Sequence, residues 1–319
     1  MGFIWKRIVT SLPTMFLVSV LTFGAFRLIP GDAALLSLGL EASAGQLEAL
    51  RAEMGLDRSF PAQYLSWLKG LFTGSLGYSS RFRGIPVSEM ILERLPVTFA
   101  LAGFSFLLIL IIAIPVSLLS VKRENSITDR FVTTLTALNI SIPGFFLGVL
   151  FIWIFGVLLK FFVPGGYVGY RENPAAFFVY LFFPSLAIAL PNAALVVKFL
   201  RASIFSEFGS AYARTARSKG GSRSTILRRH VLKNASLPVI TLLGMITGDV
   251  LSGSIVIEQV FGIPGIGRLL ISSISSRDYP MIETIIVYIA FAVILTNTLA
   301  DISLQIVDPR IRLGERFKT

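Results

Sequence analysis

Long apolar runs separated by short polar segments dominate the pattern of this chain. Six runs reach the length of about 18 residues that a helix needs to cross the hydrocarbon core of a bilayer. The predicted spans are Ile8–Leu28, Pro96–Val121, Phe131–Val163, Phe177–Leu200, Leu237–Ile257 and Ile282–Val307. This pattern predicts an all-α integral membrane protein whose six transmembrane helices form a single domain over residues 1–319.

The first apolar run follows Lys6 and Arg7, as the core of a secretory signal peptide would. It is longer than such a core, however, and no pair of small residues marks a cleavage site after it. We therefore expect the run to be retained as the first span.

Prolines mark the third and fourth runs. Pro143, Pro184 and Pro191 lie inside them, and proline removes a backbone donor and disturbs the preceding helical turn. The third run is also long enough to tilt or to project past the bilayer. We expect these spans to be interrupted, and to flex or to pack around a cavity.

A more polar segment, residues 31–95, follows the first run. Ser43 and Gln46 have the spacing of a capping box, and Gly55 suits the end of the helix that the box begins. Pro61 suits the first turn of a second helix. The segment is predicted to be a small helical insertion outside the membrane.

Positive charge orients the predicted spans. The chain has 29 lysines and arginines against 18 acidic residues, a formal net charge of +11. Six spans place most of these bases on one side: Lys6, Arg7, Lys122, Arg123, Arg130, those of residues 198–233, Arg310, Arg312, Arg316 and Lys318. The acids on that side are Glu124, Asp129, Glu207, Asp308 and Glu315. Because cytoplasmic segments are rich in Lys and Arg, we expect both termini inside and residues 31–95 outside. Orientation explains the charge, so binding to nucleic acid is not needed.

The longest basic segment, residues 201–235, is called the basic loop below. A helix is predicted from Ser206 to Lys219, ended by Gly220–Gly221, and a second helix begins at Ile226. The first helix is rich in alanine and lacks the large apolar face of a lipid-binding helix. It therefore suits close contact with a partner protein, although the charge alone would also hold the loop against anionic membrane lipid.

The segment RTARSKG, followed by ILRRHVLKNASLP, resembles the "EAA" loop of permeases from binding-protein-dependent ABC importers, and most of all their dipeptide/oligopeptide/nickel branch. In the family pattern, Glu-Ala-Ala is followed after three residues by Gly. Arg214, Thr215, Ala216 and Gly220 occupy these positions here, and Arg in place of Glu is usual in the peptide branch. Further segments resemble that branch in the same order: RLIPGD, QLEALRAEMGLD, ILERLPVTFALA, SIPGFFLGVL, VIEQVFGIPGIGRLL, RDYP and DPRIR.

The resemblance implies a permease subunit of an ATP-driven importer in the cytoplasmic membrane of a bacterium or archaeon. Its cargo would be peptides or, alternatively, a nickel chelate or another small solute. The partners implied are a second homologous permease, two ATPase subunits or domains that bind ATP and Mg²⁺, and an extracytoplasmic substrate-binding protein. The coupling helix that contacts the ATPase would use Tyr212, Ala213, Arg214, Thr215, Ala216, Arg217, Lys219 and Gly220.

The chain offers little chemistry of its own. It has no cysteine and one histidine, which excludes thiolate and paired-histidine metal sites. It also lacks the Gly-Lys dipeptide of a P-loop, so we predict no catalytic residue and no bound cofactor.

Asp249 lies inside the fifth predicted span, where an ionisable residue often faces a pore or a partner. It could line a substrate path and meet an ammonium group, or it could make a satisfied contact between helices. A self-sufficient secondary transporter is the alternative from another functional class. That class predicts several buried charges and internal repeats, and only Asp249 fits that expectation here.

Overall fold

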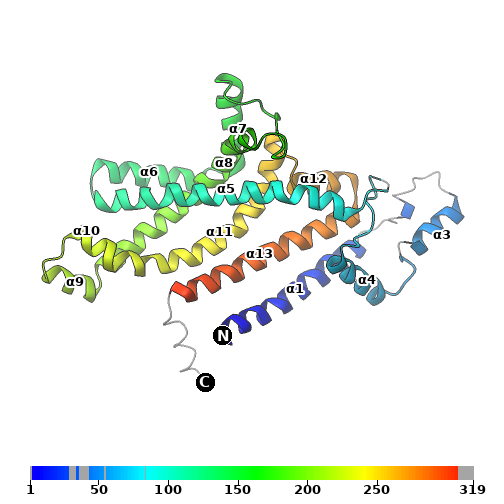
Figure 1. Cartoon of the computed structure of the whole chain (residues 1–319), viewed down its shortest axis with the longest axis horizontal. Coiled ribbons are helices and arrows are strands. Elements are labelled where there is room, and N and C mark those ends of the chain that lie inside the picture. Colours follow the sequence, from blue (N-terminus) through cyan, green and yellow to red (C-terminus); the bar gives the residue numbers. More distant parts are fainter. Residues whose placement is uncertain (1, 29–33, 36–42, 54, 83, 308–319) are drawn as a thin grey trace. The chain divides into compact units, whose positions relative to one another are not determined.

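The computed structural model describes residues 2–28, 34–35, 43–53, 55–82 and 84–307, with the side chains of 2–8, 53 and 304–307 left aside. Within this part the backbone is helical apart from turns and loops, and an isolated β-bridge joins Tyr78 to Pro86 (Figure 1). The all-α prediction is confirmed. The described part does not include insertion residues 31–33 and 36–42, the side chains of Lys6 and Arg7, or Arg310, Arg312, Arg316 and Lys318.

Five of the six predicted spans are single long helices in the described part of the chain. Each is apolar and long enough to cross a membrane. They are α1 (Gly2–Leu28), α5 (Val87–Lys122), α8 (Pro174–Phe208), α11 (Leu232–Phe261) and α13 (Tyr279–Val307). The helices extend beyond the apolar runs at most of their ends, by as many as nine residues at the start of α5.

The third predicted span is broken. Helix α6 (Ile127–Ser141) ends before Pro143. The next helical segment is bent by 100° relative to α6, and it consists of α7 (Gly144–Phe151) followed by the π-helix η1 (Ile152–Leu158). Ile142 is extended, as expected for a residue that precedes proline. Within the described residues, six helical segments are therefore long and apolar enough to cross a membrane when this bent pair counts as one.

Helix α8 is continuous through Pro184 and Pro191, so the interruption predicted at these two residues is wrong. Pro191 has no N–H to donate to the Ala187 carbonyl four residues earlier. The same carbonyl oxygen lies 3.1 Å from where a Cβ of Gly144 would be. The backbone of the broken span thus approaches α8 where a proline has left a carbonyl without its helical partner.

The chain forms two compact units. Unit 1 comprises Met1–Phe99 and Pro264–Ile294. The predicted insertion is helical, as α3 (Ala44–Glu53) and α4 (Phe60–Thr73), and the capping box is confirmed because the Ser43 N–H donates to Gln46 Oε1 at 3.1 Å. Phe23 of α1 is fully buried against the rings of α4, with its centroid 5.2 Å from that of Trp67.

Helix α12 (Ile266–Ser276) also belongs to unit 1 and precedes a tight turn at Arg277. The buried carboxylate of Asp278 accepts hydrogen bonds from the Ser79 hydroxyl and, at 3.1 Å, from the Ser80 N–H. This carboxylate therefore fixes the start of α13 to the loop that precedes α5.

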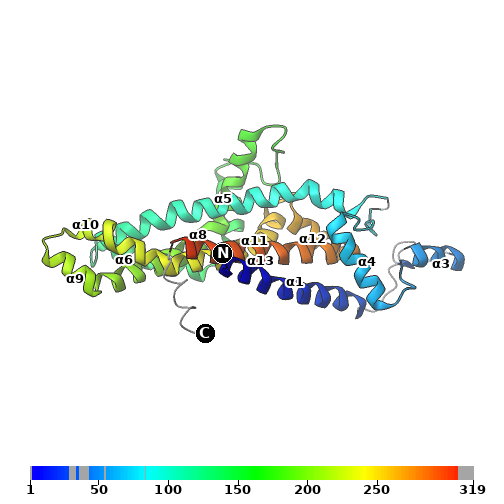
Figure 2. The same ribbon diagram turned by 60° about the horizontal axis from the view of Figure 1, so that its bottom comes forward.

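Unit 2 comprises Ala100–Ile263 and Leu295–Thr319. Helix α8 forms its centre and packs against α6, α7 and α11 (Figure 2). The Tyr180 hydroxyl of α8 donates to the Phe261 carbonyl at the end of α11, at 2.6 Å. Small residues allow close helix contacts elsewhere in the unit, as at Gly244 of α11, which lies against Ala300 of α13.

Replacing Gly244 by Ala should destabilise unit 2. The added Cβ would lie 2.4 Å from the Ala300 Cβ, so the helices must move apart. We expect the free energy of unfolding to fall by about 1–3 kcal/mol, measured by thermal unfolding of the purified protein in detergent. Gly253→Ala on the same helix is the control, because its Cβ would meet no atom within 4 Å. Equal melting temperatures for the two variants would contradict this packing.

Candidate functional site

The helix predicted over Ser206–Lys219 is divided in the structure. Helix α8 continues to Phe208, and a separate helix, α9 (Ala211–Ser218), begins after Gly209. Ser210 caps α9, because its hydroxyl accepts a hydrogen bond from the Ala213 N–H at 3.4 Å. The alanine-rich composition favoured one helix, but a Gly-Ser pair is a stronger signal for an end and a new start.

The predicted end of α9 is confirmed. Gly220 has φ +82°, a conformation that other residues rarely adopt. The Gly220 N–H donates to the Arg217 carbonyl at 2.9 Å, and the Gly221 N–H donates to the Ala216 carbonyl at 3.1 Å. A Cβ on Gly221 would lie 2.9 Å from that carbonyl oxygen. The two glycines thus let the chain leave α9 within one tight turn.

The candidate residues gather on one short helix and divide between its two faces. Ala213 is fully buried and Ala216 is half-buried, so they hold α9 against its own chain. Arg214, Thr215, Arg217, Lys219 and Gly220 are exposed. None of the three cations forms an ion pair with another described residue. The outer face of α9 is therefore a rigid basic surface, suited to an acidic or hydrogen-bonding partner.

Tyr212 lies at the edge of this surface, and its hydroxyl donates to the Glu207 carboxylate at the end of α8. Partial burial, together with this neighbouring carboxylate, raises the pKa of Tyr212 above its usual value of about 10. The phenol therefore stays protonated at neutral pH and keeps α9 attached to α8.

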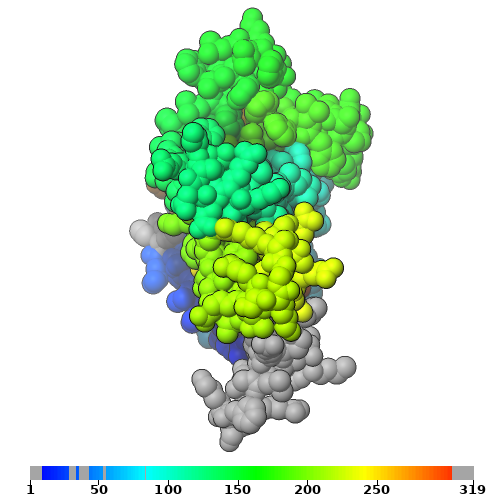
Figure 3. All heavy atoms as spheres, turned by 90° about the vertical axis from the view of Figure 1, so that its left-hand side faces the viewer, coloured from blue at the N-terminus to red at the C-terminus, as the bar shows by residue number. Residues whose placement is uncertain are grey.

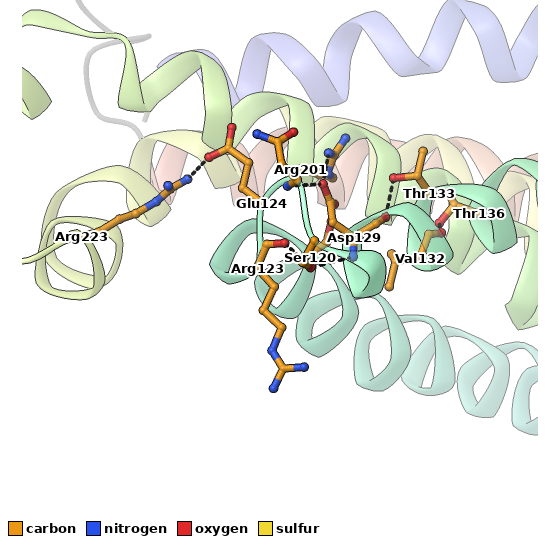
Figure 4. Close-up of polar contacts among 11 residues, drawn as sticks. Ser120, Arg123, Glu124, Asp129, Val132, Thr133, Thr136, Arg201 and Arg223 are labelled. Carbon is orange, nitrogen blue, oxygen red and sulfur yellow. Dashed lines mark hydrogen bonds and ion pairs between the residues drawn. The ribbon is translucent and has the colours of Figure 1, made fainter.

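A further polar cluster joins the turn between α5 and α6 to both arms of the basic loop (Figure 4). Buried Asp129 of α6 accepts hydrogen bonds from the Ser120 hydroxyl, from the Asn125 N–H at 3.1 Å and from Arg201 of α8 at 3.0 Å. Glu124 forms an ion pair with Arg223. Sequence reasoning identified these acids only as charges on a basic side. Because these acids lie on a side of the chain that is rich in bases, the sequence could have indicated that they pair with arginines.

Seen from one end of unit 2, helix α9 and the short helix α10 (Arg223–Ile226) lie beside the α5–α6 turn (Figure 3). After α10 the chain passes through the π-helix η2 (Leu227–Val231) into α11. The basic loop therefore enters from α8 and returns directly into α11. Any displacement of α9 acts on these two helices first.

Asp249 lies in α11, outside the basic loop. Its side chain is exposed and forms no hydrogen bond or ion pair with another described residue. It is part of an exposed row spaced by three or four residues, called the α11 stripe: Asn234, Pro238, Thr241, Met245, Asp249, Ser252, Val256 and Gln259. Five of the eight are polar or charged, which makes this face unsuited to lipid.

Among the described residues, no group of three or more His, Cys, Asp and Glu side chains is arranged to hold a metal ion.

Two family models match the chain. Residues 113–313 match the binding-protein-dependent transport system inner membrane component, and residues 1–102 match the N-terminal part of such membrane components. A putative peptide transport system permease protein of Brucella abortus is 37% identical over 309 residues, covering 97% of this chain and 98% of the relative. The oligopeptide transport system permease protein AppB of Bacillus subtilis is 35% identical over 312 residues, covering 97% and 99%.

A solved structure shares the fold. The inward-facing methionine ABC transporter MetNI contains a chain that superposes with a TM-score of 0.56 at 18% sequence identity. The match covers 70% of this chain and 98% of that one. At this identity the comparison establishes the arrangement of helices.

The end of α9 should depend on the conformation of Gly220. Alanine at φ +82° is strained by about 1–2 kcal/mol, whereas asparagine tolerates this region better. We expect Gly220→Ala to lose more hydrogen-exchange protection than Gly220→Asn at the amides of residues 213–221, measured by mass spectrometry. Equal protection in the two variants would show that the left-handed turn does not hold the helix.

Proposed function

Because this chain belongs to the family of binding-protein-dependent transport system inner membrane components, we propose that it is one membrane-spanning subunit of an ATP-driven importer whose cargo is peptides. As a family member it is a multi-pass protein of the bacterial inner membrane. The observation that carries the proposal is relatedness along the whole chain, since permeases named for peptide transport align with 97% of it. A nickel chelate or another small solute is the alternative cargo.

The family supplies the membrane component, so we assign ATP and Mg²⁺ to separate ATPase subunits. The absence of a Gly-Lys dipeptide from the sequence supports this division. A complete importer would then contain this chain, a second homologous permease, two ATPase subunits or domains, and an extracytoplasmic binding protein that delivers the peptide.

In this proposal α9 is the coupling helix that contacts an ATPase subunit. Its exposed bases, its buried alanines and its fixed ends support that role, because a short rigid helix can pass the closure of a motor to the spans as a rigid-body movement. The positive charge of the basic loop supports a cytoplasmic position for α9.

We assign the α11 stripe to the substrate path. A carboxylate at membrane depth is tolerated where it faces water or a polar partner, and Asp249 points away from its own chain. The second permease would cover the stripe, leaving a polar passage between the two subunits. There Asp249 would attract the N-terminal ammonium group of a passing peptide.

The double variant Arg214→Glu with Gly220→Pro should abolish peptide uptake. It reverses a charge on the docking surface and breaks the turn that ends α9. We expect ATP-driven uptake in proteoliposomes containing the complete importer to fall at least tenfold, and the ATPase subunits to be lost on purification. Arg171→Glu, an exposed charge reversal outside the basic loop, should change neither. Normal uptake by the double variant would contradict the assignment of α9.

Asp249→Asn should discriminate between peptides by their amino group. If the carboxylate attracts an ammonium group, uptake of a free-amine tripeptide should fall about tenfold, equivalent to about 1.4 kcal/mol. Uptake of the N-acetylated tripeptide should remain at its wild-type rate. An equal loss for both peptides would contradict charge recognition at this residue.

A further inference from the structure

The basic loop is attached to the α5–α6 turn on both sides of α9. Arg201 lies about two turns before the end of α8, ahead of α9, and Arg223 is the first residue of α10, behind it. Both arginines meet an acid from the same short stretch, Asp129 and Glu124 (Figure 4). The helix proposed to contact the ATPase is thus held from its two flanks by one turn of the chain.

In the attachment ahead of α9, the acid is buried and has several partners, while the Arg201 side chain is 30% exposed. Asp129 is 4% exposed, and its oxygens accept from a side chain of α5, a backbone N–H of the turn and the guanidinium of α8. The Asp129 N–H in turn donates to the Ser126 hydroxyl at 3.2 Å, which begins α6. A carboxylate with this many partners fixes three segments in one geometry, because moving any of them removes a hydrogen bond from a buried charge.

The Arg201 side chain uses only part of its hydrogen-bonding capacity in this attachment. Its guanidinium reaches Asp129 through one terminal nitrogen, while the buried Nε has no hydrogen-bond partner among the described residues. The same group lies over the Phe205 ring, 4.9 Å from its centroid. An arginine fork with an unused buried donor has the capacity to pair differently when α8 moves.

The attachment behind α9 is exposed and simpler. Arg223 pairs with Glu124, and its guanidinium also lies 5.2 Å from the centroid of the Phe208 ring, at the end of α8. The two side chains are 50% and 37% exposed, so the pair contributes little to stability on its own. The pair is important for its position, because it joins α10, the end of α8 and the α5–α6 turn.

We propose that the Asp129–Arg201 and Glu124–Arg223 pairs form a clamp through which α9 moves the α5–α6 turn together with α8 and α11. The clamp rests on the proposed role of α9 in coupling. Without it, a push on α9 could bend the two arms of the loop, and only the packing of α6 against α8 would carry the movement to the α5–α6 turn. With it, the four helices respond as one body. These four residues are positioning residues, since they act through α9 and touch neither ATP nor cargo.

The exposed pair allows a test that does not endanger folding. Glu124→Arg, Arg223→Glu and the double exchange are prepared as complete importers, and tripeptide transported per ATP hydrolysed is measured in proteoliposomes. We expect each single variant to retain its ATPase subunits and to hydrolyse ATP within twofold of the wild-type rate. The transport ratio should fall at least threefold in both and recover in the double exchange. Arg130→Glu, a charge reversal at an exposed α6 residue outside the clamp, should leave the ratio unchanged.

Asp129→Asn extends the test to the buried pair. We expect a larger loss of the transport ratio, about tenfold, in importers that retain their ATPase subunits. Single variants with a wild-type ratio, or a double exchange that does not recover, would overturn the clamp while leaving the proposed function intact. A wild-type importer that takes up no tripeptide with ATP would instead overturn the proposed function and the clamp with it.

Discussion

Every backbone N–H and C=O that lies in the membrane must find a partner within the protein, since hydrocarbon offers none. This constraint makes the spans helical and decides where a break is tolerated. At Pro143 the chain bends by 100°, and the Phe146 N–H immediately uses the Pro143 carbonyl, at 3.0 Å, to begin α7. At Pro191 the helix continues, and the Ala187 carbonyl, to which Pro191 has no N–H to donate, lies against Gly144. The two prolines therefore affect the backbone differently, with a break at Pro143 and a continuous helix at Pro191, on segments that pack together.

Sequence reasoning succeeded where the determinant is local. Apolar length predicted the spans, and the Ser43–Gln46 spacing predicted the start of α3 because the capping partners are three residues apart. It failed at Pro184 and Pro191, where a proline in an apolar run looks the same whether the helix bends sharply or continues. The difference depends on what packs beside each proline, and no pattern along one segment contains that information.

The exposed surface of α9 was visible in the sequence, whereas the side chains that support the helix were not. The α9 residues form a contiguous motif, so one stretch of sequence was enough to bring them together. The acids that hold the loop are 72 and 99 residues away from their arginines, and they could be seen only as isolated negative charges. Similarly, Asp249 was visible as a charge in an apolar run, but the polar stripe around it became apparent only once burial showed which face of α11 is uncovered.

The residues that hold α9 in place are different from the bases that it exposes, and this separation affects how the sequences of related permeases can diverge. The helix depends on Ala213, on the Ser210 cap and on the two terminal glycines, and none of these needs the exposed bases. Arg214, Arg217 and Lys219 can therefore drift by single substitutions without unfolding the loop. Under the proposed coupling role of α9, a duplicated copy could adapt to a different ATPase subunit through a handful of surface mutations, while natural selection kept its spans unchanged.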